Sequence, residues 1–204
     1  MQKLVIFDTE TTGLSEEDRI IQVGAIVVEL GNPSYFEEAY DELCSSDILI
    51  KIEAMSTHGI RQEDIKDKPP FSDTKFKKRF DELNNSENYL IAHNLEFDKK
   101  MIEKEGYQNN IHYKLIDTLQ CAKHLFEIGD SINNYKVSNH KLQTFRYMMF
   151  SQNEEENEAK KYGVEIKAHD AIGDVVILKM FLVKIFLRAK EKFQLMDSKQ
   201  VFDK

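Results

Sequence analysis

The sequence predicts an α/β fold in which helices pack on a mixed β-sheet, and three observations lead to this prediction. The chain opens with strand-like apolar segments that pair back on one another as a meander, which is typical of antiparallel strands. Later strand-like segments alternate with helical patterns, which is typical of parallel strands. A length of 204 residues without an internal repeat or a linker-like segment fits one domain.

Five strands are expected. Residues 3–7 form an apolar run typical of a buried central strand. Residues 20–30 and 35–40 follow and are separated by a Gly-Asn-Pro-Ser turn. Residues 89–92 and 115–116 are short apolar runs that lie between helical patterns. Together these segments predict a mixed five-stranded sheet.

Helical patterns fill most of the remaining chain, so we expect helices on both faces of the sheet. Residues 127–140 are polar and rich in asparagine, which indicates a loop. Residues 152–161 carry three consecutive glutamates, which indicates a solvated surface segment. The longest apolar helix contains two lysines and is too short and too charged for a membrane span. The expected helices are 52–66, 73–86, 97–105, 118–126, 141–150 and 171–187.

Composition and charge exclude several classes of protein. With 41% hydrophobic and 31% charged residues, the chain is neither disordered nor a membrane protein. Its two cysteines cannot build a disulfide scaffold or a metal knuckle, and its apolar N-terminal run is too short for a signal peptide. We therefore expect a cytoplasmic protein. The net charge of −8 excludes nucleic-acid binding through a broad positive face.

Two acids lie directly after the first strand. Asp8 and Glu10 are two residues apart, so in extended chain both side chains point to the same face. They would lie at the carboxyl end of a central strand, where open α/β sheets bind ligands. Two anions so close repel each other unless a cation lies between them. The alternative is a turn in which Asp8 only accepts a backbone hydrogen bond.

Two further acids and a histidine follow later elements. Asp98 comes just after the strand at 89–92, although the first turn of a helix favours an acid anyway. Asp174 lies in an otherwise apolar stretch, where a buried acid needs a cation or a donor. His169 can approach Asp174 only from the loop before the helix, because five residues along a helix separate two side chains widely. A structural histidine is the alternative.

Four carboxylates without clustered cysteines or histidines favour a hard cation such as Mg²⁺ or Mn²⁺. Two such ions about 4 Å apart support phosphoryl transfer, in which one activates water and the other stabilises the leaving oxygen. A neutral histidine beside the attacking water can accept its proton near neutral pH.

Three motifs in order carry a resemblance. They are Asp-Thr-Glu-Thr-Thr-Gly at 8–13, His-Asn-Leu-Glu-Phe-Asp at 93–98 and His-Asp-Ala-Ile-Gly-Asp at 169–174. They resemble the motifs of the DEDDh (DnaQ-like) 3′–5′ exonucleases, and among these the proofreading epsilon subunits of bacterial DNA polymerase III. Weaker matches are Ser-Thr-His-Gly-Ile at 56–60 and Ile-Asp-Thr-Leu at 116–119. Three motifs at the family's spacing are far more specific than any one alone.

The resemblance implies an RNase H-like fold and a 3′–5′ exonuclease that removes nucleoside monophosphates from DNA in proofreading or repair. By position, the implied metal ligands are Asp8, Glu10, Asp98 and Asp174, holding two Mg²⁺ or Mn²⁺ ions, and the implied general base is His169. The residues implied in binding the terminal nucleotide are Thr9, Thr11, Thr12, Leu14, His58 and Asn94, with Phe97 supporting the second motif.

Two departures from the family pattern stand out. Gln22 occupies a position in the second strand where the family commonly has an acid. The chain between Leu142 and His169 is also longer than usual, and it contains the acidic run, which we expect to lie away from the bound strand. Lys75–Phe80 and Lys99–Lys100 are candidates for phosphate contact, although for the first a solvated helix face is the favoured interpretation.

Two other functions stay open at this point. An RNA-trimming enzyme of the ribonuclease T or oligoribonuclease kind would differ in its treatment of the 2′-hydroxyl, which the sequence does not show. A catalytically silent binding module is disfavoured because all five catalytic positions are intact. We expect residues 1–188 to form the exonuclease domain and 189–204 a C-terminal helical tail. The expected partners are a single-stranded 3′ end and possibly a DNA polymerase subunit, with no membrane.

Overall fold

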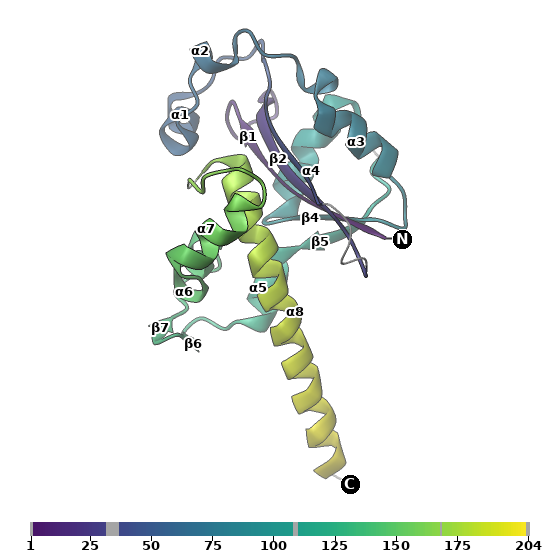
Figure 1. Ribbon diagram of the computed structural model, residues 1–204, viewed down its shortest axis with the longest axis vertical. Helices are drawn as coiled ribbons and strands as arrows, with labels where there is room; N and C mark the ends of the chain where they lie inside the picture. The colour runs from purple at the N-terminus through teal and green to yellow at the C-terminus, as the bar shows by residue number, and fades with distance from the viewer. Residues whose placement is uncertain (1, 32–36, 108–109, 168, 203–204) are drawn as a thin grey trace.

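A computed structural model describes residues 2–31, 37–107, 110–167 and 169–202, with side chains through Lys192. Its centre is a five-stranded sheet in the order β3-β2-β1-β4-β5 (Figure 1). Strand β2 pairs antiparallel with β1 and β3, whereas β4 pairs parallel with β1 and β5. The predicted mixed sheet is therefore confirmed. The strands are β1 (Lys3–Thr11), β2 (Ile20–Glu29), β3 (Glu38–Leu43), β4 (Tyr89–Ala92) and β5 (Lys114–Asp117).

Strand β1 is longer than the apolar run that predicted it. It continues through Thr11, because its polar end stays paired with β2 as far as Glu10 opposite Gln22. The register then shifts between Glu10 and Thr11, which marks an irregularity where the strand leaves the sheet. Strand β3 also lies later than predicted. It begins at Glu38, and residues 35–36 of the predicted strand lie outside the described residues.

Two predicted helices differ from their expected bounds. The segment expected at 52–66 forms α1 (Ile52–His58) and α2 (Gln62–Ile65), because Gly59 ends α1 in the left-handed conformation with φ of 76°. The helix expected at 73–86 is the shorter α3 (Lys75–Leu83), preceded by a 3₁₀ turn, η1 (Phe71–Asp73). The hydroxyl of Thr74 caps α3 by accepting a hydrogen bond from the backbone of Lys77.

Four more helices follow the later strands. After β4 comes α4 (Leu95–Ile102), extended by a π-helical turn, η2 (Glu103–Tyr107). After β5 comes α5 (Thr118–Leu125), and α6 (Leu142–Met149) lies close to its predicted bounds. The last helix, α8, runs from Ala171 to Phe202 and so crosses the predicted domain boundary at 188 without a break. The division into a domain and a tail stays a prediction.

Two segments differ from their predictions. The predicted loop at 127–140 contains a small hairpin of β6 (Ser131–Ile132) and β7 (Tyr135–Lys136). The predicted solvated segment at 152–161 is helix α7 (Gln152–Lys160), which starts with a capping box. One of its glutamates, Glu155, is buried, so this prediction was wrong for the middle of the acidic run. A buried acid needs a partner, and Glu155 has one in α6.

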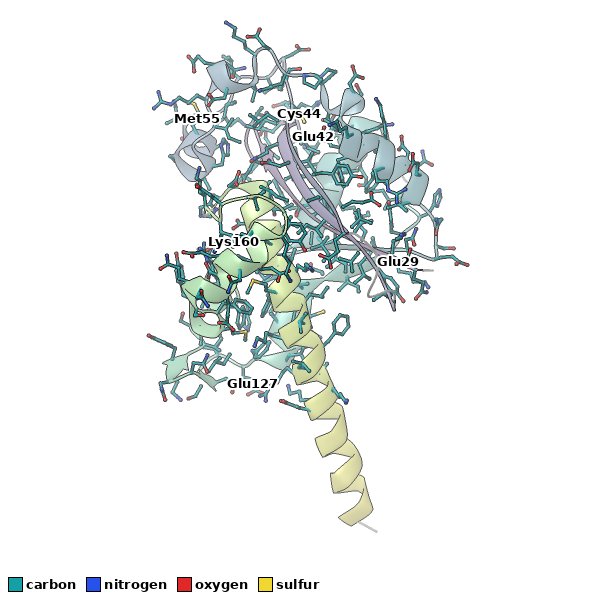
Figure 2. All side chains as sticks on the ribbon, viewed as in Figure 1. Glu29, Glu42, Cys44, Met55, Glu127 and Lys160 are labelled. Carbon is teal, nitrogen blue, oxygen red and sulfur yellow. The ribbon has the colours of Figure 1, made fainter. Side chains whose placement is uncertain are left out.

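The two faces of β1 are covered by different helices. Alternate side chains of a strand point to opposite faces, so Leu4 and Ile6 join a core with α8. Val5 and Phe7 join a second core with Phe76 and other residues of α3. Helices on both faces of the sheet are therefore confirmed. Figure 2, in which Lys160 marks α7, shows the side chains of α6 and α7 beside the N-terminal half of α8.

The start of α8 lies against β2 at unusually short range. A Cβ atom added to Gly24 would lie 2.3 Å from the backbone carbonyl carbon of Ala171, so only glycine fits there. This contact places the first turn of α8 at the polar end of β1. The C-terminal part of α8 extends away from the rest of the molecule (Figure 1). None of the helices in the described part of the chain has the length and apolar character needed to cross a bilayer.

Candidate active site

Three elements bring the four predicted carboxylates to one edge of the sheet. Asp8 and Glu10 lie on one face of β1, near its carboxyl end. Asp98 lies in the first turn of α4, directly after β4, and because β4 is parallel to β1 their carboxyl ends meet at the same edge. Asp174 lies in the first turn of α8. Residues far apart in sequence thus share one site.

Burial raises the pKa values of all four acids, and mutual repulsion raises those of Asp8 and Glu10 further. Burial, followed by the charges of Asp98 and Glu10, raises the pKa of Asp8 well above its ordinary value. Burial and then Asp174 raise the pKa of Glu10 to about 8. Burial raises the pKa of Asp98 to about 7 and that of Asp174 to about 6. A cation among these groups would relieve both the repulsion and the cost of burial.

The four carboxylates differ in their partners. Asp98 Oδ1 accepts hydrogen bonds from the backbone N–H of Thr9 at 3.1 Å and from its hydroxyl at 2.8 Å, which joins α4 to β1. Asp174 Oδ1 accepts one from Gln143 Nε2 at 2.6 Å. Within the described residues, neither Asp8 nor Glu10 accepts a side-chain hydrogen bond or pairs with a cation. Their oxygens are the ones left available for a ligand.

The donor set fits a hard divalent cation. Carboxylate oxygens are the ligands that Mg²⁺ and Mn²⁺ prefer, and four of them surround this edge of the sheet. As the side chains are oriented, no three His, Cys, Asp or Glu residues among those described converge closely enough to hold an ion. Binding therefore requires these side chains to rotate toward a common centre.

His169 lies in the segment that leads into α8, as its spacing from Asp174 predicted. It is exposed and has a φ of 57°, a conformation that few residues other than glycine adopt. Although burial raises the pKa of Asp174, the nearby charge of His169 is the main opposing influence. His169 is thus close to this acid and open to solvent. Its neighbour Ala168 lies outside the described residues.

Gln22 is a buried residue that connects three segments behind the carboxylates. Its amide nitrogen donates to Asp41 Oδ1 at 3.0 Å and to Asp170 Oδ1 at 2.9 Å. Its amide oxygen accepts from the backbone N–H of Ala171 at 3.3 Å. A neutral amide can both donate and accept hydrogen bonds, whereas an acid at this position would be repelled by the carboxylates of Asp41 and Asp170. The sequence showed the departure from the family but not these partners.

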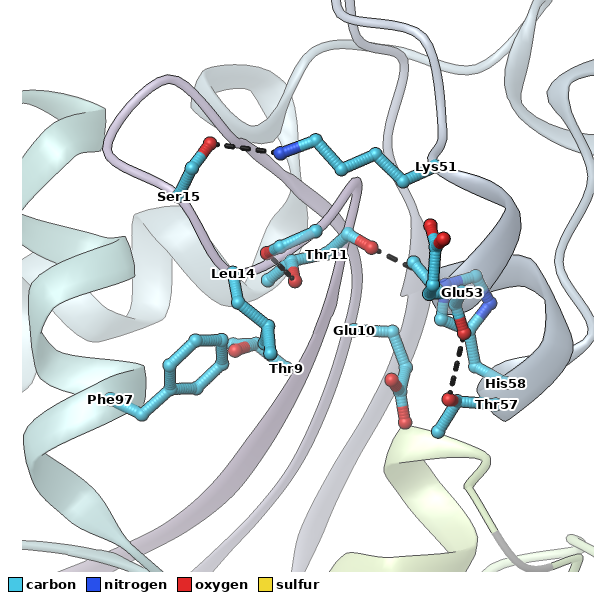
Figure 3. A pocket seen from close by; sticks show the side chains of 12 residues that line it. Thr9, Glu10, Thr11, Leu14, Ser15, Lys51, Glu53, Thr57, His58 and Phe97 are labelled. Atoms are coloured by element: carbon cyan, nitrogen blue, oxygen red, sulfur yellow. Dashed lines mark hydrogen bonds between the residues drawn. The ribbon is translucent and has the colours of Figure 1, made fainter.

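A pocket of about 570 Å³ opens beside Glu10 (Figure 3). Leu14 is 86% exposed and lies opposite the ring of Phe97 in this view. The wall on the other side comes from α1, whose Glu53, Thr57 and His58 face the pocket. The structure therefore brings four of the six predicted nucleotide-binding residues to one cavity, namely Thr9, Thr11, Leu14 and His58.

Thr12 does not line this pocket, which corrects the prediction. Its side chain is fully buried, and its hydroxyl donates to Asp18 Oδ1 at 2.8 Å. Asp18 also accepts from the Ser15 backbone at 2.6 Å and from Lys51 Nζ at 2.6 Å. Although burial opposes it, the hydrogen bond from Lys51 and the others hold the pKa of Asp18 well below its usual range. Thr12 thus helps to fix the loop that presents Leu14.

Asn94 lies outside the main pocket. It borders a neighbouring cavity of about 250 Å³ that shares Leu14 and Phe97 with the pocket. It has a φ of 75°, and its backbone N–H donates to Asp117 Oδ1 at 3.2 Å. The carboxylate of Asp117 also caps α5. Asn94 therefore shapes the turn between β4 and α4, where Phe97 and Asp98 begin.

His58 has a defined tautomer. Its Nδ1 accepts a hydrogen bond from the backbone N–H of Ile60 at 3.0 Å. The proton must then be on Nε2, which lies 3.3 Å from the carbonyl oxygen of Thr11 and donates to it. Burial lowers the pKa of His58, and the charge of His169 adds to this effect. The two histidines therefore lie within electrostatic range of each other.

Several of the basic residues that the sequence offered for phosphate contact are already paired with acids. Lys99 lies 2.8 Å from Glu103, and Lys100 lies 3.5 Å from Glu96. In α3, Lys77 lies 2.6 Å from Asp81. These pairs lie on helix surfaces, where an ion pair contributes little and can be exchanged for another anion.

Comparison with known families shows to which family this chain belongs. The family model described as Exonuclease (RNase_T) matches residues 5–181, which include all four carboxylates and His169. The chain belongs to this exonuclease family. The predicted resemblance to DnaQ-like enzymes and to the epsilon subunit is confirmed by a relative from Buchnera aphidicola, a DNA polymerase III subunit epsilon. The two are 34% identical over 138 residues, covering 61% of this chain and 57% of the relative.

Solved structures share the fold of this exonuclease. Escherichia coli Exonuclease I, in complex with a dT13 oligonucleotide, covers 96% of the chain with a TM-score of 0.68 and 18% identity, over 43% of its own length. Exonuclease X, in complex with 5′ overhanging duplex DNA, covers 91% of the chain with a TM-score of 0.58 and 21% identity, over 90% of its own length. The RNase H-like fold is thereby confirmed. The chain spans 57% and 62% of the first two curated relatives.

Proposed function

We propose that this exonuclease is a divalent-cation-dependent 3′–5′ enzyme that releases nucleoside monophosphates from single-stranded DNA ends. The observation that carries the proposal is the meeting of four carboxylates, from β1, α4 and α8, beside a pocket of about 570 Å³. That volume lies in the range of small-ligand pockets and suits one terminal nucleotide. The scissile phosphate would then lie over the carboxylates.

Asp8, Glu10, Asp98 and Asp174 would hold two Mg²⁺ or Mn²⁺ ions. When bound, such ions lower the pKa of water and stabilise the leaving 3′ oxygen. Thr9 keeps Asp98 directed at the site through its two hydrogen bonds. His169 is exposed beside Asp174 and would accept the proton of the attacking water. The products are a nucleoside 5′-monophosphate and a strand shortened by one nucleotide.

The pocket walls supply the contacts for the terminal nucleotide. Leu14 and Phe97 offer apolar faces on which a base can lie. Thr11 is held in place by its hydroxyl, which donates to the carbonyl of Gly13 at 2.7 Å, and by the His58 contact to its own carbonyl. The loop is rigid because Asp18 holds it, so Leu14 needs little reordering when substrate binds.

DNA is the substrate we favour over RNA. The curated relative is a DNA polymerase III subunit, and the two solved relatives hold DNA. These relatives also support a cytoplasmic role in replication or repair, and a DNA polymerase subunit as a partner. A role in RNA trimming and a catalytically silent module are the outcomes against which the proposal is tested.

The test is digestion of matched, end-labelled single-stranded DNA and RNA of the same sequence with Mg²⁺ or with a chelator. We expect mononucleotide release from the 3′ end of DNA in Mg²⁺ and none with the chelator. Faster digestion of RNA would favour the RNA-trimming alternative. No digestion of either strand by a protein that still binds DNA would establish the silent module instead.

A further inference from the structure

A chain of hydrogen bonds leads from Asp174 away from the pocket. Its first member is Gln143 in α6, whose Nε2 donates to Asp174 Oδ1 at 2.6 Å. The other amide atom, Oε1, accepts from Arg146 Nη1 at 3.3 Å. Because a guanidinium can only donate, Oε1 must face Arg146, and this fixes Nε2 toward Asp174. Gln143 thus holds Asp174 Oδ1 in one orientation.

The next member is a buried ion pair between α6 and α7. Arg146 Nε lies 3.0 Å from both carboxylate oxygens of Glu155, and its Nη2 lies 2.6 Å from Oε2. The two side chains are only 10% and 8% exposed. This multiple contact fixes the orientation of the guanidinium more firmly than a single hydrogen bond would.

The balance of charge in this chain matters for Asp174. The positive charge of Arg146 is near enough to help lower the pKa of Asp174, after the larger effects of burial and His169. Glu155 holds the guanidinium on the far side of Gln143. The charge of Asp174 also acts on Arg146, so without Glu155 a buried and unpaired Arg146 would gain by turning to this acid. It would then compete with a cation.

We propose that Gln143, Arg146 and Glu155 form a positioning relay that holds Asp174 ready for a divalent cation, so that α7 supports the active site. The acidic run in α7 therefore has two kinds of glutamate: Glu155 belongs to the relay, and its neighbour Glu156 is exposed. This inference rests on the proposed function, since it requires a cation at Asp174. It goes beyond that function by assigning a role to the segment that departs from the family pattern.

The experiment measures Mn²⁺ binding to the full chain by titration calorimetry, and the Mg²⁺ concentration that gives half-maximal digestion. The variants are Q143M, E155Q and the double variant E155Q/R146M, with E156Q as the matched control. E156Q removes the same charge from the same helix outside the relay. Thermal unfolding of each metal-free variant checks that it is folded.

We expect Q143M and E155Q to weaken Mn²⁺ binding about ten- to a hundredfold, the usual effect of removing a group that orients a metal ligand. The half-maximal Mg²⁺ concentration should rise by the same factor, with little change in KM for the oligonucleotide. E156Q should bind Mn²⁺ like the wild type. E155Q/R146M should recover part of the loss, because the competing cation is gone, and a purely structural pair would not show this recovery.

Results that contradict the relay can be distinguished from results that contradict the proposed function. If the wild type binds Mn²⁺ and both Q143M and E155Q bind it equally well, the relay is overturned and the proposed function stands. If the wild type binds no Mn²⁺, the proposed function and the relay fall together. A folded double variant no better than E155Q overturns the restraining role of Glu155. Should E155Q not fold, Q143M decides, because methionine matches glutamine in size and leaves the ion pair intact.

Discussion

Asp8 is the residue on which the site depends most directly, because it interacts with the other three acids. Replacing it with asparagine removes a charged oxygen donor, which should lower turnover at least about a thousandfold, as loss of several kcal/mol of cation-dependent stabilisation would. The metal-free variant should unfold at a higher temperature near pH 8, since one repelling anion is gone. Kinetics and thermal unfolding measure the two effects.

Asp67 provides the control, because it is exposed and its side chain forms no hydrogen bond or ion pair with the described residues. Asp67→Asn removes the same charge and should leave both turnover and unfolding unchanged. Near-normal turnover in Asp8→Asn would contradict the proposed role of the acids.

The raised pKa of Glu10 predicts how the stability of the metal-free protein depends on pH. Its pKa is raised from 4.5 to about 8, so the folded state keeps a proton that the unfolded chain has lost. This contribution to stability is fully present below about pH 4.5 and is lost as the pH rises through about 8. The metal-free protein should therefore lose stability across this window, and Glu10→Gln should lose less.

Thermal unfolding in chelator, compared between wild type and Glu10→Gln at each pH, isolates this group from others that titrate. At this chain length each kcal/mol corresponds to about 2–4 °C in Tm. Added Mn²⁺ should make the Tm of the wild type fall less steeply with pH, as Glu10→Gln does. Parallel curves for the two proteins would show that Glu10 ionises normally in the fold.

The sequence indicated the charged residues of the site more clearly than the neutral residues that hold them in place through hydrogen bonds. Acids such as Asp98 stood out because little in a strand–helix turn requires them. Gln143 did not stand out, and Gln22 stood out only as a departure from the family pattern, since a glutamine in a strand or helix is unremarkable until its partners are known. Their roles depend on distances between elements that are far apart in the chain. Thr12 was assigned to the nucleotide pocket by resemblance alone, which could not show that its hydroxyl is buried against Asp18.

At the scale of elements, the seating of α8 on β2 is the contact that sets the geometry of the site. Gly24→Ala would put a Cβ 2.3 Å from the backbone of Ala171, and backbone cannot move aside easily. We expect destabilisation of about 1–3 kcal/mol, typical of an overpacked core. Turnover should also fall, because Asp174 is carried by the displaced turn.

Thermal unfolding and digestion rates measure both consequences of Gly24→Ala. Adding Mn²⁺ should recover part of the lost stability if the displaced acids can still share a cation. If Gly24→Ala kept both the stability and the turnover of the wild type, α8 would be able to shift without disturbing the acids.

Element boundaries were the weakest part of the sequence prediction. The helix expected at 52–66 is interrupted by Gly59, whose left-handed conformation no periodicity reveals. The acidic run was assigned to solvent because three glutamates are rarely buried, yet Arg146 neutralises one of them. Local composition could not show a partner in α6. The strands were found more reliably, because apolar runs bounded by polar turns are a strong local signal.

On the scale of the whole molecule, the net charge of −8 predicts how DNA binding responds to salt. Lys99 and Lys100, which directly follow Asp98, are paired with Glu103 and Glu96, so we expect a bound strand to gain few phosphate contacts beside the acids. For single strands, the logarithm of the binding constant falls with the logarithm of the salt concentration by about 0.7 for each neutralised phosphate. Two or three phosphate contacts would therefore give a slope of about −1.4 to −2.

Binding of a labelled single-stranded oligonucleotide by Asp174→Asn, followed over a range of KCl concentrations, measures this slope without digestion. The double variant Lys99→Gln/Lys100→Gln tests whether these two lysines exchange their acids for phosphate, and it should reduce the slope by about one. A slope several times steeper would reveal a basic surface that the paired lysines do not provide.

The overall architecture was predictable for a reason that also explains the site. A meander followed by alternating strands and helices leaves few ways to build one sheet, and each of them gathers the carboxyl ends of β1 and β4 at the same edge. The acids that follow these strands therefore meet whatever the details of packing. What topology alone did not define was the distance between them, which the start of α8 determines.

Because α8 both carries Asp174 and packs against the first two strands, the order in which the chain is synthesised has a chemical consequence. Asp174 leaves the ribosome 166 residues after its partner Asp8, the difference between positions 174 and 8. Until α8 emerges, a nascent chain carries the other acids on a sheet that this helix has not yet covered. The proposed cation site is therefore complete only after Asp174 has been synthesised.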